Sequence, residues 1–136
     1  MRILAIDTNA YTAFKRGDTS VVAVLRHAPE MLVSVIVLGE LLAGFAAGSR
    51  QRENRDDLTR FLHSPRVRVV PIGPGTADFY ALVYAALRQQ GQPIPTNDLW
   101  IAASCLEHGA ALLTLDSHFQ HVGGLRVGMR LEDFLP

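Results

Sequence analysis

The sequence predicts an α/β fold of three layers, α/β/α, with a central, mainly parallel sheet of four to five strands. Two observations predict it. Short apolar runs with the length of buried strands alternate along the chain with longer segments of helical periodicity. Strands separated by helices are joined by crossovers, and such crossovers give parallel sheets with helices on both faces.

The first half of the chain is expected to form two strands, at the apolar runs 3–6 and 31–34. The first run stops at Asp7, as expected of a central strand covered on both faces. The helices of this half are 8–16, 19–27, an apolar helix around Glu40 that Gly48 can end, and a polar helix at 50–63 that Pro65 ends.

The second half continues with a strand at 66–71, helices at 76–90 and 99–108, a strand at 111–115 and an edge strand at 125–129. The helix at 76–90 has the clearest signal, because apolar residues recur along it at three- and four-residue spacing. Gly109 is expected to end the last helix, and Asp116 directly follows the strand at 111–115.

Composition limits the class of protein. The 136 residues, of which 49% are hydrophobic and 19% charged, suit a single globular domain over residues 1–136. Thirteen basic and thirteen acidic residues balance, so no overall field draws the chain to nucleic acid or to a membrane. The single cysteine, Cys105, cannot form an internal disulfide, and the first acid comes too early for a signal peptide. We therefore expect a cytoplasmic protein.

The apolar segment 31–48 is long enough to suggest a membrane span, but it contains Glu40 near its centre. A carboxylate there costs roughly 2.5–3.5 kcal/mol, and three glycines weaken the segment further. A globular helix is therefore favoured, yet on a helix Glu40 has no polar face, since the residues three and four positions away are apolar or glycine. Such a glutamate is solvated, or forms a buried ion pair, for example with an arginine, or binds a metal.

Four acids lie at the ends of predicted elements, where parallel sheets bind ligands. Asp7 and Asp116 follow strands, Asp98 lies at the start of a helix, and Glu40 lies in the helix after the second strand. All four could point toward one rim of the sheet. Carboxylates so close together repel unless a cation binds. Mg2+ or Mn2+ suits oxygen ligands, and two such ions about 4 Å apart can promote phosphodiester hydrolysis.

Each acid also has an ordinary structural interpretation. Asp7 and Asp98 could be helix caps or partners of a helix dipole, and Asp116 could be a turn residue. The residues alone leave both interpretations open.

Four segments in order, IDTNAY, VLGELLAG, PIPTNDLWIAA and LLTLDSHF, resemble the motifs of PIN-domain ribonucleases, and among these the VapC-type toxins of type II toxin–antitoxin pairs. The similarity runs from Ile3 to about Phe119 and implies a PIN-like three-layer fold. It implies a Mg2+-dependent endoribonuclease, in which an acidic cluster holds a metal-activated water that cleaves RNA phosphodiester bonds. Mn2+ is a possible substitute for Mg2+.

The resemblance also assigns roles to residues. The implied catalytic and metal-binding residues are Asp7, Glu40, Asp98 and Asp116, of which Asp7 and Asp98 would be the more direct ligands. The residues implied to orient these carboxylates by hydrogen bonds are Thr8, Asn9, Thr114 and Ser117.

Partners follow from the resemblance as well: an RNA substrate, a small VapB-type antitoxin, a second copy of the chain in a homodimer, and no membrane. An antitoxin tail would lie in an apolar groove, for which the candidates are Tyr11, Phe14, Val22, Leu25, Leu41, Leu42 and Phe45. Ordinary core packing is the alternative for each of them.

Other basic and aromatic signals are weaker. The arginines between residues 50 and 60 alternate with acids, which favours a solvated, salt-bridged face over an RNA-binding track. The five histidines are scattered, mostly at helix ends, where surface positions are favoured; His118 lies near enough to Asp116 to touch substrate, a less favoured role.

Rival classes fit less well. A receiver domain needs a lysine after a late strand, but Lys15 is the only lysine; a phosphatase of the DxD type needs an aspartate where Asn9 stands. A non-catalytic protein- or RNA-binding α/β module and a PIN nuclease of RNA processing remain as alternatives.

Overall fold

The computed structural model describes residues 2–136, so Met1 of the predicted domain lies outside the described residues. Five strands form one sheet in the order β3-β2-β1-β4-β5, and every pairing is parallel. The strands are β1 Ile3–Ile6, β2 Glu30–Ser34, β3 Val67–Val70, β4 Ala111–Leu113 and β5 Val127–Gly128. The predicted α/β class is therefore confirmed.

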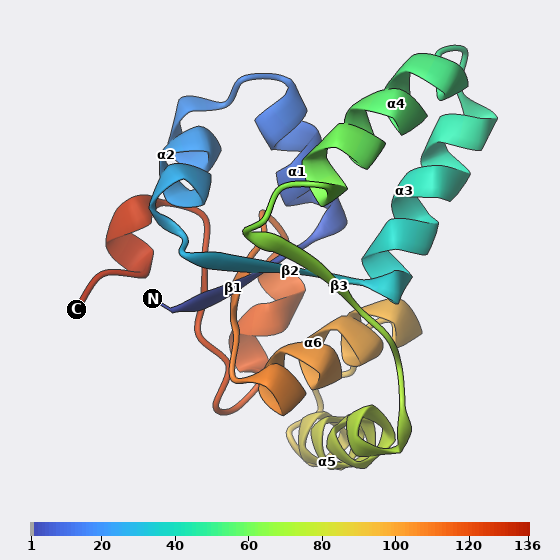
Figure 1. Cartoon of the computed structure of the whole chain (residues 1–136). Coiled ribbons are helices and arrows are strands. Elements are labelled where there is room, and N and C mark those ends of the chain that lie inside the picture. Colours follow the sequence, from blue (N-terminus) through green and yellow to red (C-terminus); the bar gives the residue numbers. More distant parts are fainter. Residues whose placement is uncertain (1) are drawn as a thin grey trace.

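Helices cover both faces of the sheet, with α1 to α4 on one side and α5 and α6 on the other (Figure 1). The helices are α1 Thr8–Lys15, α2 Thr19–His27, α3 Val35–Ala47, α4 Gln51–Leu62, α5 Pro74–Gln89 and α6 Thr96–His108. Two short 3₁₀ helices, η1 Ser117–His121 and η2 Leu131–Asp133, lie in the C-terminal part. The architecture is the expected three-layer α/β/α arrangement.

The order of the strands positions the site. The chain proceeds from β1 outward to β2 and β3, and α5 and α6 then return it to β4 on the other side of β1. The connections after β1 and β4 therefore diverge, which opens a crevice at the carboxyl ends of these two strands. α6 runs back along the sheet before β4, so its N-terminus lies at the same rim.

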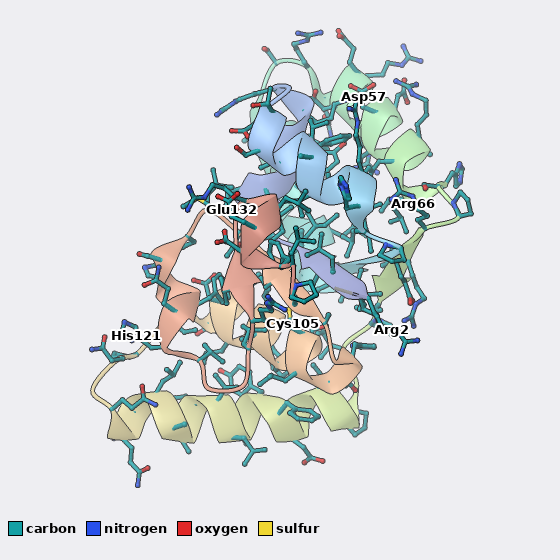
Figure 2. All side chains as sticks on the ribbon, turned by 90° about the vertical axis from the view of Figure 1, so that its left-hand side faces the viewer. Arg2, Asp57, Arg66, Cys105, His121 and Glu132 are labelled. Atoms are coloured by element: carbon teal, nitrogen blue, oxygen red, sulfur yellow. The ribbon has the colours of Figure 1, made fainter. Side chains whose placement is uncertain are left out.

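The core is built on β1, β2 and β4, whose residues are almost all buried, because these strands are covered on both faces. Leu4, Leu112 and Leu113 have no exposed surface. Phe119 of η1 and Phe134 near the C-terminus are also completely buried, and they fasten the two 3₁₀ segments to the core. Cys105 lies in the interior on α6 (Figure 2), as its apolar surroundings predict.

Several element boundaries differ from the predicted ones. α6 begins at Thr96 rather than 99, so Asp98 lies within its first turn. β4 ends at Leu113 rather than 115, because the N–H group of Leu115 donates to the side chain of Asn9 instead of to a neighbouring strand. β5 is shorter than predicted, since the N–H group of Met129 donates to the carboxylate of Asp133.

The predicted groove residues do not share one environment. Tyr11, Leu25 and Leu41 are 3–4% exposed and belong to the core, so their assignment to a surface groove is wrong. Their side chains fill the space between α1, α2, α3 and the sheet that a three-layer fold must close. The remaining four candidates, Phe14, Val22, Leu42 and Phe45, are partly buried.

The apolar segment 31–48 is divided between β2 and α3. Over residues 2–136, no helix combines the length and the apolar character needed to cross a bilayer.

Candidate active site

A cavity of about 450 Å³ opens at the carboxyl ends of β1 and β4. Its lining includes all four predicted acids, Asp7, Glu40, Asp98 and Asp116. They come from four different places: the end of β1, the middle of α3, the first turn of α6 and the loop after β4. Tertiary structure thus brings together residues that are 109 positions apart in the chain at the extremes, from 7 to 116.

Asp7 is the most deeply held of the four, with 5% of its surface exposed. One carboxylate oxygen accepts a hydrogen bond from the backbone N–H of Thr8 (2.8 Å), and the other accepts one from the hydroxyl of Thr114 (2.6 Å). Asp7 is also the N-cap of α1, so its predicted role as a helix cap is confirmed. Burial raises the pKa of Asp7 above its usual value, as do the charges of Asp98 and Glu40, although both hydrogen bonds oppose the rise.

Glu40 points into the cavity from α3 and is partly buried. The hydroxyl of Thr8 donates to its Oε1 (2.6 Å), and the side-chain amide of Asn97 donates to its Oε2 (3.2 Å). No arginine or lysine in residues 2–136 forms an ion pair with Glu40. The alternative of a buried ion pair with arginine is therefore wrong, and Glu40 is held by neutral donors.

Asp98 and Asp116 are linked by His118. The Nδ1 atom of His118 lies 3.0 Å from Oδ2 of Asp98 and 3.1 Å from Oδ1 of Asp116. Asp116 caps η1, because its Oδ1 also accepts the backbone N–H of His118 (2.9 Å). Burial raises the pKa of Asp98, the hydrogen bond with His118 opposes this, and the charges of Asp116 and Glu40 add to the rise. Both carboxylates raise the pKa of His118.

The four residues predicted to orient the carboxylates lie in different positions. Thr8 and Thr114 each donate a hydroxyl to a carboxylate, of Glu40 and Asp7 respectively. Asn9 instead accepts from the N–H of Leu115 (3.0 Å), so it fastens the loop after β4 to α1. Ser117 is exposed and, within the described part of the chain, makes no hydrogen bond to a carboxylate, so its expected role has no contact behind it.

Three further residues of the site do not belong to the predicted set: His118, for which the sequence favours a surface position, and Asn97 and Arg16, which have no predicted role. His118 lies two residues after Asp116, the spacing at which a residue after an Asp cap can fold back onto it. Arg16 is exposed and lines the cavity, as does Thr12. The two residues are four positions apart, and this helical spacing is the sequence signal that indicates Arg16. Only the contact between α3 and the N-terminus of α6 reveals Asn97.

The chemistry of these donors fits a hard divalent cation. The four acids supply carboxylate oxygens, the preferred ligands of Mg2+ and Mn2+. Arg16 lines the same cavity, but none of the four acids forms an ion pair with a lysine or arginine of residues 2–136. Asp98, Asp116 and His118 offer three ligand atoms within 4.8 Å of one another. The site could therefore bind a metal ion.

Comparison with known proteins agrees with the fold. A family model of the PIN domain matches residues 4–125, which is most of the chain. The chain therefore belongs to the PIN-domain family.

Within this family, its relatives are VapC ribonucleases. The chain is similar to Ribonuclease VapC1 of Rickettsia felis, with 32% identity over 91% of this chain and 93% of the relative. It is 33% identical to Ribonuclease VapC4 of Mycobacterium tuberculosis over 64% of this chain and 67% of that protein. The solved structure of VapBC2 from Rickettsia felis, bound to a promoter DNA fragment, has the same fold, with a TM-score of 0.80, 24% identity and coverage of 93% and 97%.

Proposed function

We propose that this chain is a metal-dependent endoribonuclease and the toxin of a toxin–antitoxin pair, acting as a single domain over residues 1–136. The observation that carries the proposal is the convergence of Asp7, Glu40, Asp98 and Asp116 in one cavity with no lysine or arginine paired to them in residues 2–136. An arrangement of carboxylates that costs folding energy suits a site completed by a cation. The relatives named as VapC ribonucleases support the reaction class.

The four acids would hold Mg2+, with Mn2+ as a possible substitute. A divalent cation in such a site activates water and stabilises charge that develops on the phosphoryl oxygens. Thr8 and Thr114 hold Glu40 and Asp7 in place by short hydrogen bonds, so these carboxylates need little rearrangement. Asn9 keeps the loop that carries Asp116 close to α1. Ser117 is proposed as an orienting residue only through the family resemblance.

RNA is the proposed substrate. Arg16 supplies positive charge at the edge of the acidic cavity, where it can contact a phosphate beside the one that reacts. The acids are recessed, Asp7 most of all, so a splayed single strand or loop can approach them more closely than a duplex can.

A VapB-type antitoxin is the proposed partner, and a homodimer is the proposed assembly. The similarity of the chain to the VapBC2 structure supports the first of these. The partly buried apolar residues Phe14, Val22, Leu42 and Phe45 are the part of the predicted groove that remains available for an antitoxin tail. Cytoplasm is the proposed location.

Cleavage of single-stranded RNA by the purified chain tests the enzyme. We expect cleavage in Mg2+, its loss with a chelator, and its return when Mg2+ is added back. Asp7→Asn and Asp98→Asn should each lower the rate on the order of 100-fold. Asp56→Asn, at an exposed acid on α4, is the matched control and should cleave like the wild type. Cleavage that survives both substitutions and chelation would contradict the proposal.

Growth of cells tests the toxin. Expression of the chain without a partner should stop growth, and Asp7→Asn should relieve the arrest. Cells that tolerate a demonstrably active protein would contradict the toxin assignment while leaving the nuclease in place.

A further inference from the structure

His118 brings an imidazole nitrogen into contact with two of the acids of the cavity. The proposed function assigns the metal to four carboxylates and gives His118 no role in binding it. Its Nδ1 atom nevertheless lies between Asp98 and Asp116, 3.0 Å from one carboxylate oxygen and 3.1 Å from the other. This position makes His118 part of the same donor set.

We propose that His118 is a metal ligand, and that its imidazole makes this site prefer borderline transition-metal ions such as Mn2+, Co2+ and Ni2+ to Mg2+. The inference rests on the metal site of the proposed function and specifies which ions that site selects.

The distances suit ligation. Two ligands at adjacent corners of an octahedron with bonds of about 2.1 Å lie about 3 Å apart. The separations between Nδ1 and the two carboxylate oxygens have this value. An ion that binds here therefore finds the imidazole nitrogen already spaced as a neighbour of each carboxylate oxygen, with all three donor atoms within 4.8 Å of one another.

The local structure holds the imidazole in place before an ion arrives. The backbone N–H of His118 donates to Asp116, and the next residue, Phe119, is completely buried and anchors η1. The His118 side chain is 49% exposed, so the ring can carry its proton on Nε2 in contact with water and present the Nδ1 lone pair to a cation. A fixed ligand loses little freedom on binding, which favours affinity.

The identity of the donor decides the preference. Mg2+ favours oxygen ligands and gives up its water reluctantly, so a nitrogen donor adds little to its binding. Imidazole suits the first-row transition metals, whose affinity for nitrogen sites rises from Mn2+ through Co2+ to Ni2+. A site of four carboxylates alone would discriminate less among these ions.

A different role would produce the same distances, because a protonated Nδ1 that donates hydrogen bonds to both carboxylates also lies about 3 Å from them. His118→Asn separates the two roles. The asparagine amide nitrogen can donate a hydrogen bond from nearly the place of Nδ1 but has no lone pair for a metal, and the amide oxygen is a hard ligand without the preference of imidazole for transition metals. His118→Ala removes both capacities.

The experiment titrates the metal-free full chain with Mg2+, Mn2+ and Ni2+ by calorimetry. We expect the wild type to bind Ni2+ most tightly and Mg2+ least tightly. Both His118 variants should lose affinity for Ni2+ on the order of tenfold, with a change for Mg2+ of less than about threefold. Electron spin echo spectroscopy of the Mn2+-loaded protein should show coupling to an imidazole nitrogen that both variants lose.

His121→Ala is the matched control, since His121 lies on the same 3₁₀ helix and points away from the molecule (Figure 2). It should keep the wild-type affinities and the nitrogen coupling. Wild-type metal affinities and spectra in His118→Asn would overturn the inference, because a hydrogen bond would then explain the geometry.

The inference and the proposed function fail in different ways. If the His118 variants keep the metal preference while Asp98→Asn abolishes metal binding and RNA cleavage, the inference is wrong and the proposed function stands. If Asp98→Asn also leaves metal binding and cleavage unchanged, both are wrong.

Discussion

The acids of helix α4 and the acids of the cavity are treated in opposite ways by the same chain. On α4, Glu53 pairs with Arg50, and Asp57 pairs with Arg60 and, at 3.4 Å, with Lys15. In the cavity, the carboxylates are held by threonine hydroxyls, backbone and side-chain amides and His118, with no lysine or arginine of the described residues paired to them.

The two groups of acids differ in the source of the positive charge that balances their carboxylates. Glu53 is exposed and Asp57 is partly buried, and each has an arginine within reach, because i,i+3 neighbours on a helix meet readily. The cavity acids are partly buried, and burial raises the pKa of Asp7 and Asp98 because their charge is unfavourable there. The carboxylates whose ionised form is destabilised by burial are thus the ones that form no ion pair with a lysine or arginine, as expected of a site that binds a cation.

The largest expected contrast is in activity. Glu40→Gln should lower kcat/KM for RNA on the order of 100-fold, or about 2.7 kcal/mol, since it removes a carboxylate from the cavity. Glu53→Gln on α4 should change it less than about twofold. Cleavage assays on both variants measure this. Equal losses in the two variants would mean that the cavity acids have no special role.

The cavity acids and the α4 acids should also differ in how much a bound metal ion stabilises the folded protein. Mn2+ at about 100 times its dissociation constant should raise the free energy of unfolding by about 2.7 kcal/mol, because the ion binds only the folded site. Asp98→Asn should lose most of this gain, and Asp56→Asn on α4 should keep it. Urea unfolding with and without Mn2+ provides the measurement, and a gain that Asp98→Asn retains would place the ion elsewhere.

Alkaline pH tests the contact between α1 and α4. Tyr11 packs against Phe61 of α4 with ring centroids 5.3 Å apart, and its buried hydroxyl has no hydrogen-bond partner in residues 2–136. Burial, with the charge of Asp57, raises the pKa of Tyr11 from 10.0 to about 12. The unfolded chain therefore loses this proton at lower pH than the folded chain does.

Stability should consequently be unaffected by Tyr11 below pH 10 and fall by up to about 2 kcal/mol as the pH rises to about 12. Tyr11→Phe should remove most of this decline, whereas Tyr84→Phe, at an exposed tyrosine, should leave it. Urea unfolding from pH 8 to 12 measures it, and an unchanged decline in Tyr11→Phe would contradict the assignment.

The smallest effect is expected from the α4 ion pairs themselves. Arg60→Ala should cost less than about 1 kcal/mol, because the Arg60 side chain is 72% exposed and water screens its pairing with Asp57. The cost should shrink further at high salt. A decrease of several kcal/mol in the free energy of unfolding would contradict the prediction, because it would mean that the ion pair between Arg60 and Asp57 contributes strongly to stability.

The sequence allowed most of the fold to be predicted, because apolar runs and helical spacing are local signals. β1 and α2 have the predicted boundaries, and the sheet is parallel as the alternation of elements requires. Boundaries failed where a side chain took over a backbone hydrogen bond, as Asn9 does at the end of β4 and Asp133 does beyond β5. The side chains that accept these backbone N–H groups come from another part of the chain, as Asn9 does, or from a later turn, as Asp133 does, so the local pattern of a strand does not indicate them.

The candidate site was predictable in part for the same reason. Each acid lies at the end of an element, and element ends can be located from the sequence. Local spacing did not indicate which residue holds which acid: Thr114 reaches Asp7 across 107 positions, and Asn97 reaches Glu40 across 57. Thr8 and Thr114 were expected to orient carboxylates only through the family resemblance, and Asn97 was not expected at all. Tyr11 and Leu41 had enough apolar character for either a groove or the core, and only packing assigned them to the core.

By itself, the sequence determined the α/β class and the four acids, since both depend on residue type and local spacing. Tertiary structure decided what surrounds those acids. The order β3-β2-β1-β4-β5 brings the ends of β1 and β4 together, and only then do two threonines, an asparagine and His118 become neighbours of the carboxylates. The physical reason is that hydrogen bonds and charge interactions act over a few ångströms, a scale that a linear pattern does not encode.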